Sequence, residues 1–198
     1  VTREEAAIVA AVADEFVKVD VPDSAIRYDD AQTRIPLTTQ TGNLTGDFPV
    51  LSAGPTPHTP LADWTFALEA EDGTQIVSWS WEEFRALGPS EVTVDIHCVT
   101  RWSKFDTDWR GISVDRIFAA AGLEEPPSPF VMAFCDGGYT TNLPVEDLLE
   151  GKALVVWEYD GEPLEPEHGG PARLLVPHLY FWKGARWVRG LRVMEDNE

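Results

Sequence analysis

The stretch that decides the fold class is 64-WTFALEAEDGTQIVSWSWEEFRAL-87. Apolar residues recur on both sides of the Asp72-Gly73 pair, which predicts two strands joined by a tight turn. Ser80 and the acidic residues after it predict the start of a short helix, which ends before Gly88 and Pro89. Two strands followed by a helix favour an α+β protein over a helical bundle.

The rest of the chain continues this mixture. The alternation in 91-EVTVDIHCV-99 predicts a strand that ends at Cys98 and opens a loop through residue 111. Short helices are predicted at 113–121 and 144–149, and further strands at PFVMAFC, ALVVWEYDG, ARLLVP and RWVRGLRVME. Residues 2–19 predict an amphipathic helix, and 20–60 an extended segment. We divide the chain into an N-terminal helix and extended arm, 1–33, and one domain, 34–198.

Charge and apolar content exclude several classes of protein. The formal net charge of -19 repels nucleic acid and anionic membrane surfaces. Apolar runs stay short of the roughly 20 residues that span a membrane, and two cysteines are too few for a disulfide framework. The chain begins with acidic residues where a secretory leader is basic. We expect a cytoplasmic protein, or a periplasmic one if a leader was removed.

Positive charge gathers in one segment near the end of the chain. Residues 168–193 contain no Asp or Glu but five basic residues: Arg173, Lys183, Arg186, Arg189 and Arg192. Such a segment can be a set of strands whose arginines pair with acidic residues elsewhere. It can also form a pocket for a small anion, because guanidinium groups match phosphate and sulfate oxygens.

Cys98 is the strongest candidate for chemistry. His97, Arg101 and Lys104 stand near it, and a positive neighbourhood favours the thiolate that binds metals. A buried structural thiol is the alternative, and it is our interpretation of Cys135. Zinc is disfavoured because four histidines and two cysteines lack zinc-site spacing. A cysteine protease would pair Cys98 with a histidine, either His168 or His178, without other supporting features.

Three blocks carry a resemblance to a known family. They are 92-VTVDIHCVTRWSKFDTDWRGISVDRIF-118, 134-FCDGGYTTNLP-144 and 168-HGGPARLLVPHLYFWKGARWVRGLRV-193. In this order and spacing they resemble the oxidoreductase molybdopterin-binding domain of sulfite oxidases, plant nitrate reductases and bacterial sulfoxide reductase catalytic subunits. The match is closest to the short bacterial branch. It implies the sulfite-oxidase-type α+β fold, with mixed sheets and short helices around one molybdenum cofactor.

The resemblance also implies roles for individual residues. Cys98 would be the protein ligand of molybdenum, and we assign Arg101 to an anionic substrate. The remaining matched positions would contact the cofactor, with the basic ones and the Gly184 turn at its phosphate: Leu51, Ser52, Ala53, Gly54, Asp136, His168, Arg173, Lys183, Gly184, Ala185 and Arg186. Arg189 and Arg192 lie beyond the matched motif and are expected to be structural. Tyr139 and Trp102 are expected to be packing residues, with the lining of a substrate channel as the alternative for either one.

The activity that this resemblance implies is oxygen-atom transfer on a small substrate, either S-oxide reduction or sulfite-type oxidation. The cofactor would be Mo-molybdopterin in its mononucleotide-free form. Electrons would be exchanged with a separate redox partner, a flavin, haem or quinone-linked protein. The alternative from another class is a non-catalytic module that keeps the fold and binds the pterin or a partner without turnover.

Overall fold

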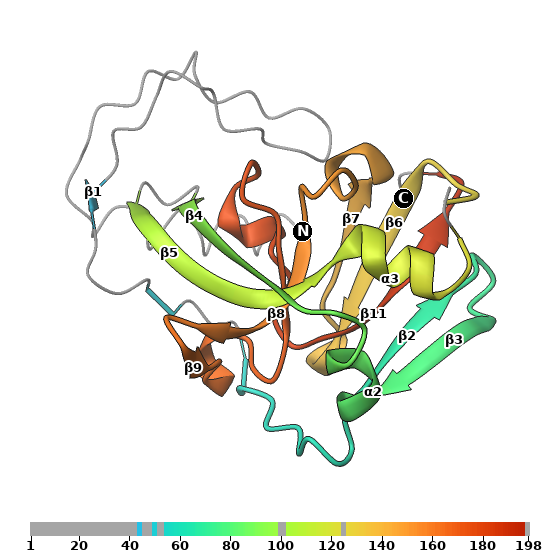
Figure 1. Ribbon diagram of the computed structural model, residues 1–198, viewed down its shortest axis with the longest axis horizontal. Helices are drawn as coiled ribbons and strands as arrows, with labels where there is room; N and C mark the ends of the chain where they lie inside the picture. Colours follow the sequence, from blue (N-terminus) through green and yellow to red (C-terminus); the bar gives the residue numbers. More distant parts are fainter. Residues whose placement is uncertain (1–42, 45–48, 51–53, 99–101, 124–125, 197–198) are drawn as a thin grey trace.

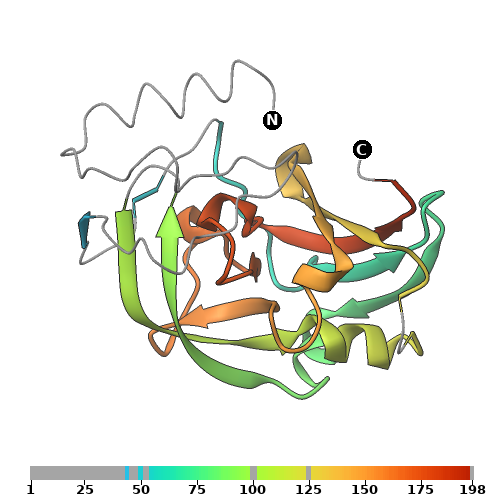
Figure 2. The same cartoon turned by 90° about the horizontal axis from the view of Figure 1, so that it is seen from above.

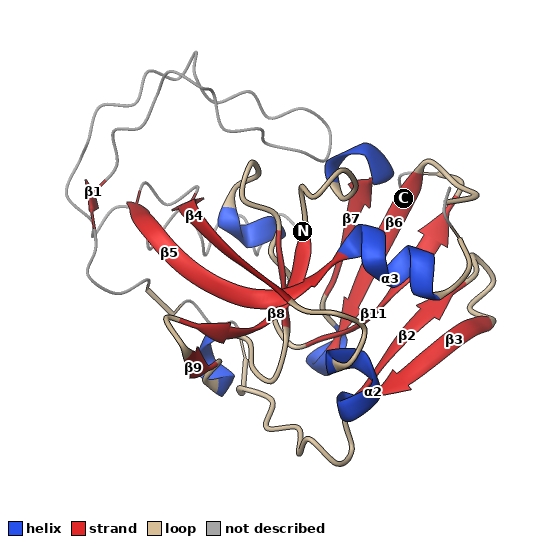
Figure 3. Ribbon diagram, in the orientation of Figure 1, coloured by secondary structure: helices blue, strands red, loops and turns tan. Residues whose placement is uncertain are grey.

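The computed structural model describes residues 43–44, 49–50, 54–98, 102–123 and 126–196. Strands predominate over short helices (Figures 1 and 3). They form two sheets, each with parallel and antiparallel pairs. This confirms the predicted α+β class with mixed sheets. No helix in the described part of the chain has the length and apolar character needed to cross a membrane.

The first sheet has six strands, and one of them is the predicted strand that ends at Cys98. Its path is β1-β5-β8-β10, with β4 also paired to β5 and β9 to β8. Only the β1–β5 pair is parallel among the described pairs of this sheet. The strands are β1 (Asn43–Leu44), β4 (Ser90–Cys98), β5 (Trp102–Ser113), β8 (Leu154–Tyr159), β9 (Glu162–Pro163) and β10 (Arg173–Leu175).

The second sheet has five strands in the order β3-β2-β11-β6-β7. Figure 2 shows it beside the long β4–β5 hairpin of the first sheet. Its centre is β11, which runs parallel to β2 and antiparallel to β6. The strands are β2 (Thr65–Glu69), β3 (Gln75–Ser80), β6 (Phe130–Cys135), β7 (Thr140–Pro144) and β11 (Val188–Met194).

The two α-helices among the described residues begin at serine caps. In α2 (Trp81–Arg85), Ser80 and Glu83 form a reciprocal capping box, and the helix starts at Ser80 as the sequence predicts. Ser113 caps α3 (Val114–Ala120), which buries Val114, Ile117 and Phe118 at helical spacing. The remaining helical turns are of the 3-10 type: η2 (Asp136–Gly138), η3 (Val145–Asp147), η4 (Pro166–His168) and η5 (Phe181–Lys183).

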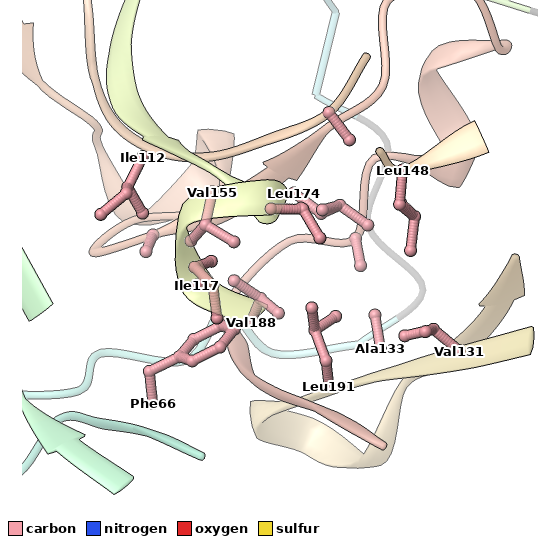
Figure 4. Close-up of a cluster of buried hydrophobic side chains, with 14 of the residues drawn as sticks. Phe66, Ile112, Ile117, Val131, Ala133, Leu148, Val155, Leu174, Val188 and Leu191 are labelled. Atoms are coloured by element: carbon pink, nitrogen blue, oxygen red, sulfur yellow. The ribbon is translucent and has the colours of Figure 1, made fainter. Parts of the chain in front are cut away.

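The hydrophobic core has two parts on opposite faces of the first sheet. The larger part joins both sheets and the two α-helices, and Figure 4 shows Val155 and Leu174 near Val188 and Leu191 in it. The smaller part contains Val156 and Leu175, which directly follow Val155 and Leu174 along their strands. Successive strand residues face opposite sides, so β8 and β10 contribute to both parts. The smaller part holds the site described below.

Two expectations differ from this fold. Residues 102–111 are not a loop, because they belong to the twelve-residue strand β5, which pairs with both β4 and β8. Pairing on both edges outweighs the low strand propensity of Asp106 and Asp108. The strand β7 was also not predicted from Thr140–Pro144. The predicted helix at 2–19 lies outside the described residues, so the boundary at 33 stays a prediction.

Candidate cofactor site

Cys98 is the last residue of β4, opposite Trp102 at the start of β5. It is partly buried and packs against the smaller core cluster, which includes Trp102 and Trp109. The preceding residue, His97, is held by a 2.8 Å contact between its Nδ1 and the Ser103 hydroxyl. Burial lowers the pKa of His97 below its ordinary value. The strand β4 therefore ends in a thiol whose neighbour in the chain, His97, is held against β5.

Arg173 lies at the start of β10 with 2% of its surface exposed. Its side chain faces the smaller core cluster, where its guanidinium lies 3.9 Å from the Phe181 ring centroid. One terminal nitrogen donates to the His168 carbonyl at 2.9 Å, and the other to the Gly184 carbonyl at 2.8 Å. Arg173 thus joins the two loops that flank β10.

The guanidinium of Arg173 is incompletely satisfied. Its buried Nε has no hydrogen-bond partner among the described residues, and none of their carboxylates forms an ion pair with it. Burial, followed by the nearby Arg186, lowers its pKa to about 9, while the thiols of Cys98 and Cys135 and the Tyr139 hydroxyl raise it. Cys98 packs against the same cluster as Phe181, the ring beside the Arg173 guanidinium, so Cys98 and Arg173 lie at one site.

Lys183 and Arg186 add two further cations on the loop after β10. Lys183 is 2% exposed, and its ammonium group donates to the Asn142 carbonyl at 2.9 Å. Burial lowers the pKa of Lys183 to about 8, and the Asp147 carboxylate offsets part of this shift by raising it. Arg186 donates to the Glu167 carbonyl at 3.0 Å and lies over the Trp187 ring. Burial lowers the pKa of Arg186 as well.

The Gly184 turn contributes tight packing to the site. A Cβ atom at Gly184 would lie 2.7 Å from the Leu174 carbonyl oxygen and 3.2 Å from an Arg173 nitrogen. Its own N–H donates to the Phe181 carbonyl, and that of Ala185 to the Lys183 carbonyl. Both N–H groups are thus used within the turn, and a contact of either one with a phosphate stays a prediction. The basic side chains nearby are further candidate donors to an anion.

His168 and Asp136 reach the site in different ways. His168 is partly buried, and burial followed by Arg173 lowers its pKa. The Asp136 carboxylate accepts hydrogen bonds from Thr59 at 2.6 Å and from Arg189 at 3.0 and 3.3 Å. Its oxygens are already used within the protein. A direct contact of Asp136 with a cofactor stays a prediction.

Four predicted site residues, Leu51, Ser52, Ala53 and Arg101, lie outside the described residues. Gly54 is described and exposed. A Cβ atom there would meet nothing within 4 Å, so the space beside it is open.

Comparison with known proteins gives the family. Residues 53–198 match the model of the oxidoreductase molybdopterin binding domain. The chain belongs to this family. It is 38% identical over 173 residues to an uncharacterized oxidoreductase, YuiH, of Bacillus subtilis, a match that covers 86% of this chain and 84% of the relative.

Two more distant proteins extend the comparison. YedZ1 of Azospira oryzae, a putative protein-methionine-sulfoxide reductase subunit, is 23% identical over 59% of this chain and 44% of its own. The crystal structure of the sulfane dehydrogenase SoxCD from Paracoccus pantotrophus has a TM-score of 0.61 at 18% identity. The match covers 71% of this chain and 40% of the SoxCD chain. It supports the sulfite-oxidase-type fold.

The described residues fit the molybdenum cofactor that this family binds. A molybdopterin carries a phosphate, and a buried guanidinium with an unused N–H offers a charge-assisted hydrogen bond to such a group. A thiol in the same electrostatic environment is a soft ligand suited to a soft metal. Cys98 would therefore bind the metal and Arg173 the phosphate, with Lys183 and Arg186 adding positive charge.

Two residues assigned mainly to packing from the sequence lie close to this site. Tyr139, expected to be a packing residue, is 36% exposed and donates from its hydroxyl to the Trp182 carbonyl at 3.2 Å. It lies near both Arg173 and Arg186. Cys135 also lies near Arg173, but burial, followed by Asp136, raises its pKa to about 12 and keeps it a thiol. No sequence motif marks either contact.

Proposed function

We propose that this chain is the catalytic unit of a molybdenum-dependent enzyme that moves an oxygen atom between a small substrate and the metal. The reaction would be S-oxide reduction or sulfite-type oxidation. The observation that carries the proposal is the shared environment of Cys98 and the buried, incompletely satisfied Arg173. When bound, the cofactor supplies the two-electron redox chemistry of oxygen transfer.

The chain's own residues supply the ligand, the anion site and the exclusion of water. The Cys98 sulfur would bind the metal. Arg173, Lys183 and Arg186 would hold the terminal phosphate of a mononucleotide-free molybdopterin, with His168 beside them. Trp102 and Phe181, whose ring centroids are 5.8 Å apart, cover the thiol side with apolar surface. This surface limits access of water to the sulfur.

Substrate and electron partner complete the proposal. Arg101 contacts an anionic substrate oxygen, as its place three residues after Cys98 allows. Electrons pass to or from a separate flavin, haem or quinone-linked protein. The naming of the Azospira oryzae relative as a reductase subunit supports a divided enzyme of this kind.

Metal and pterin content test the proposal. In a host that makes the cofactor, the wild-type chain should bind close to one molybdenum per chain, and Cys98→Ser should lose it. Cys135→Ser is the matched control and should keep the metal, because that thiol stays protonated. Retention of molybdenum in Cys98→Ser would refute the proposed ligand. A wild-type chain without metal or pterin would favour the non-catalytic module.

The direction of transfer needs an activity assay. Turnover of sulfoxides with reduced viologen would assign the chain to S-oxide reduction. Turnover of sulfite with ferricyanide would assign it to sulfite-type oxidation. Both activities should disappear in Cys98→Ser and persist in Cys135→Ser, and a loaded enzyme inactive in both assays would contradict oxygen transfer to or from sulfur.

A further inference from the structure

The carboxylate of Asp136 connects three segments that are distant in sequence. It lies at the end of β6, in the turn that leads to Tyr139. One of its oxygens accepts from the Thr59 hydroxyl at 2.6 Å, across 77 positions. Both oxygens accept from one terminal nitrogen of Arg189, on β11, at 3.0 and 3.3 Å.

Arg189 extends this connection. Its Nε donates to the Thr65 carbonyl at 2.9 Å, and its second terminal nitrogen donates to the Thr65 hydroxyl and the Asp63 carbonyl. The guanidinium therefore holds the start of β2 as well as Asp136. Pro57 packs against the same turn, 3.7 Å from the Cβ position of Gly137. The segment from Pro57 to Thr65 is thus fastened at several points beside the turn.

The main chain of Asp136 continues the connection toward the cations. Its N–H donates to the Trp187 carbonyl at 2.9 Å. Trp187 has a positive φ of 56°, a strained conformation for a large side chain that surrounding contacts must hold. Its N–H donates to Gly169 and its indole to Pro166. Arg186, which follows Ala185 and precedes Trp187, is held in place by this arrangement.

We infer that Asp136 is a positioning residue and not a direct ligand of the cofactor. With Thr59 and Arg189 it forms a clamp that fixes the 54–60 segment against the Asp136–Gly138 turn. The clamp thereby sets the places of Tyr139 and Arg186 around Arg173. The inference rests on the proposed function in one respect, namely that the positioned residues bind a cofactor. The clamp itself is a property of the protein without cofactor.

Hydrogen exchange of the full, cofactor-free chain tests the clamp directly. Asp136→Asn keeps the shape but loses the charge, and should raise exchange about tenfold in peptides covering 54–66 and 136–140. The first peptide includes the hydrogen-bonded amides of Asp63 and Trp64. Thr59→Val removes one hydroxyl, and should raise it about fivefold in the first peptide. Thr59→Ser restores the hydroxyl and should return exchange to the wild-type rate. If Asp136→Asn fails to fold, the two Thr59 variants carry the test.

The matched control is Glu69→Gln. Glu69 pairs with Arg192, three positions beyond Arg189 on the same strand, with a similar partly buried carboxylate. Glu69→Gln should leave exchange at 54–66 and 136–140 unchanged. An equal change in Glu69→Gln and Asp136→Asn would overturn the clamp, since both would then reflect general loosening of β11.

Cofactor loading separates positioning from direct contact. In the loaded protein, both Asp136→Asn and Thr59→Val should release pterin faster than wild type, in the same rank order as their exchange. Loss of pterin in Asp136→Asn with wild-type exchange and a silent Thr59→Val would instead identify a direct ligand. A wild-type chain that binds no pterin would end the proposed function, while the exchange measurement would still decide the clamp.

Discussion

The two halves of the basic segment 168–193 use the same kind of residue in opposite ways. Arg189 and Arg192 on β11 pair with the carboxylates of Asp136 and Glu69. Arg173 and Lys183 are 2% exposed and donate to backbone carbonyls, without an ion pair to any described carboxylate. Pairing with acidic residues is thus confirmed for the half on β11, and an anion pocket stays the prediction for the other half.

This difference separates charges that hold the fold from charges kept for a ligand. A buried cation without a counter-ion is costly, and the lowered pKa values of Arg173 and Lys183 express that cost. An anion that binds and neutralises these two cations would offset this free-energy cost. The arginines of β11 already pair with carboxylates, so they carry no such cost. The following predictions test this contrast, from the largest expected effect to the smallest.

Arg173→Met should weaken cofactor retention on the order of a hundredfold, because it removes charge-assisted hydrogen bonds to a phosphate. The stability of the cofactor-free chain should change much less. Two lost hydrogen bonds and the removal of a buried charge are opposing effects of a few kcal/mol each. Pterin release and urea unfolding measure the two quantities. If Arg173→Met retained the cofactor as well as wild type does, the two halves of the basic segment would not differ in ligand binding.

Gly184→Ala should destabilise the cofactor-free chain by about 1–3 kcal/mol, since its Cβ would force the Leu174 carbonyl or Arg173 to move. Cofactor content should fall with it. Gly54→Ala is the control for stability, because its Cβ would meet nothing within 4 Å. Urea unfolding compares the two. Equal stability of both variants would show that the turn adapts without cost.

Lys183 should give a pH-dependent contribution to stability. Its pKa is about 8 in the folded chain and 10.5 in the unfolded chain, so between these values the unfolded chain binds more protons. Stability from this group therefore rises with pH across that window. The advantage of Lys183→Met over wild type, measured by urea unfolding without cofactor, should shrink from pH 8 toward 10. A constant difference would contradict a buried, unneutralised ammonium group.

Glu69→Gln should have the smallest effect, at or below about 1 kcal/mol, because partly exposed ion pairs contribute little. Pterin content should equal that of wild type. Thermal unfolding and pterin fluorescence measure this variant beside Arg173→Met. Loss of pterin here would mean that Arg192 also serves the site.

Much of the local structure follows from the sequence because neighbouring residues determine it. The Ser80–Glu83 capping box and the alternation in β4 depend on residues within a few positions of one another. The strand Trp102–Ser113 could not be predicted in this way. It is specified by partners on β4 and β8, which outweigh its two internal aspartates.

The sequence by itself determined the α+β class, the family and the choice of Cys98 and Arg173 as candidate site residues. These follow from periodicity and from short motifs, which are properties of residues close together in the chain. Only the tertiary structure decided which arginines have carboxylate partners, and that Asp136 bonds to Thr59 and Arg189. Those partners lie 53 to 123 positions apart, so folding alone brings them within hydrogen-bond distance.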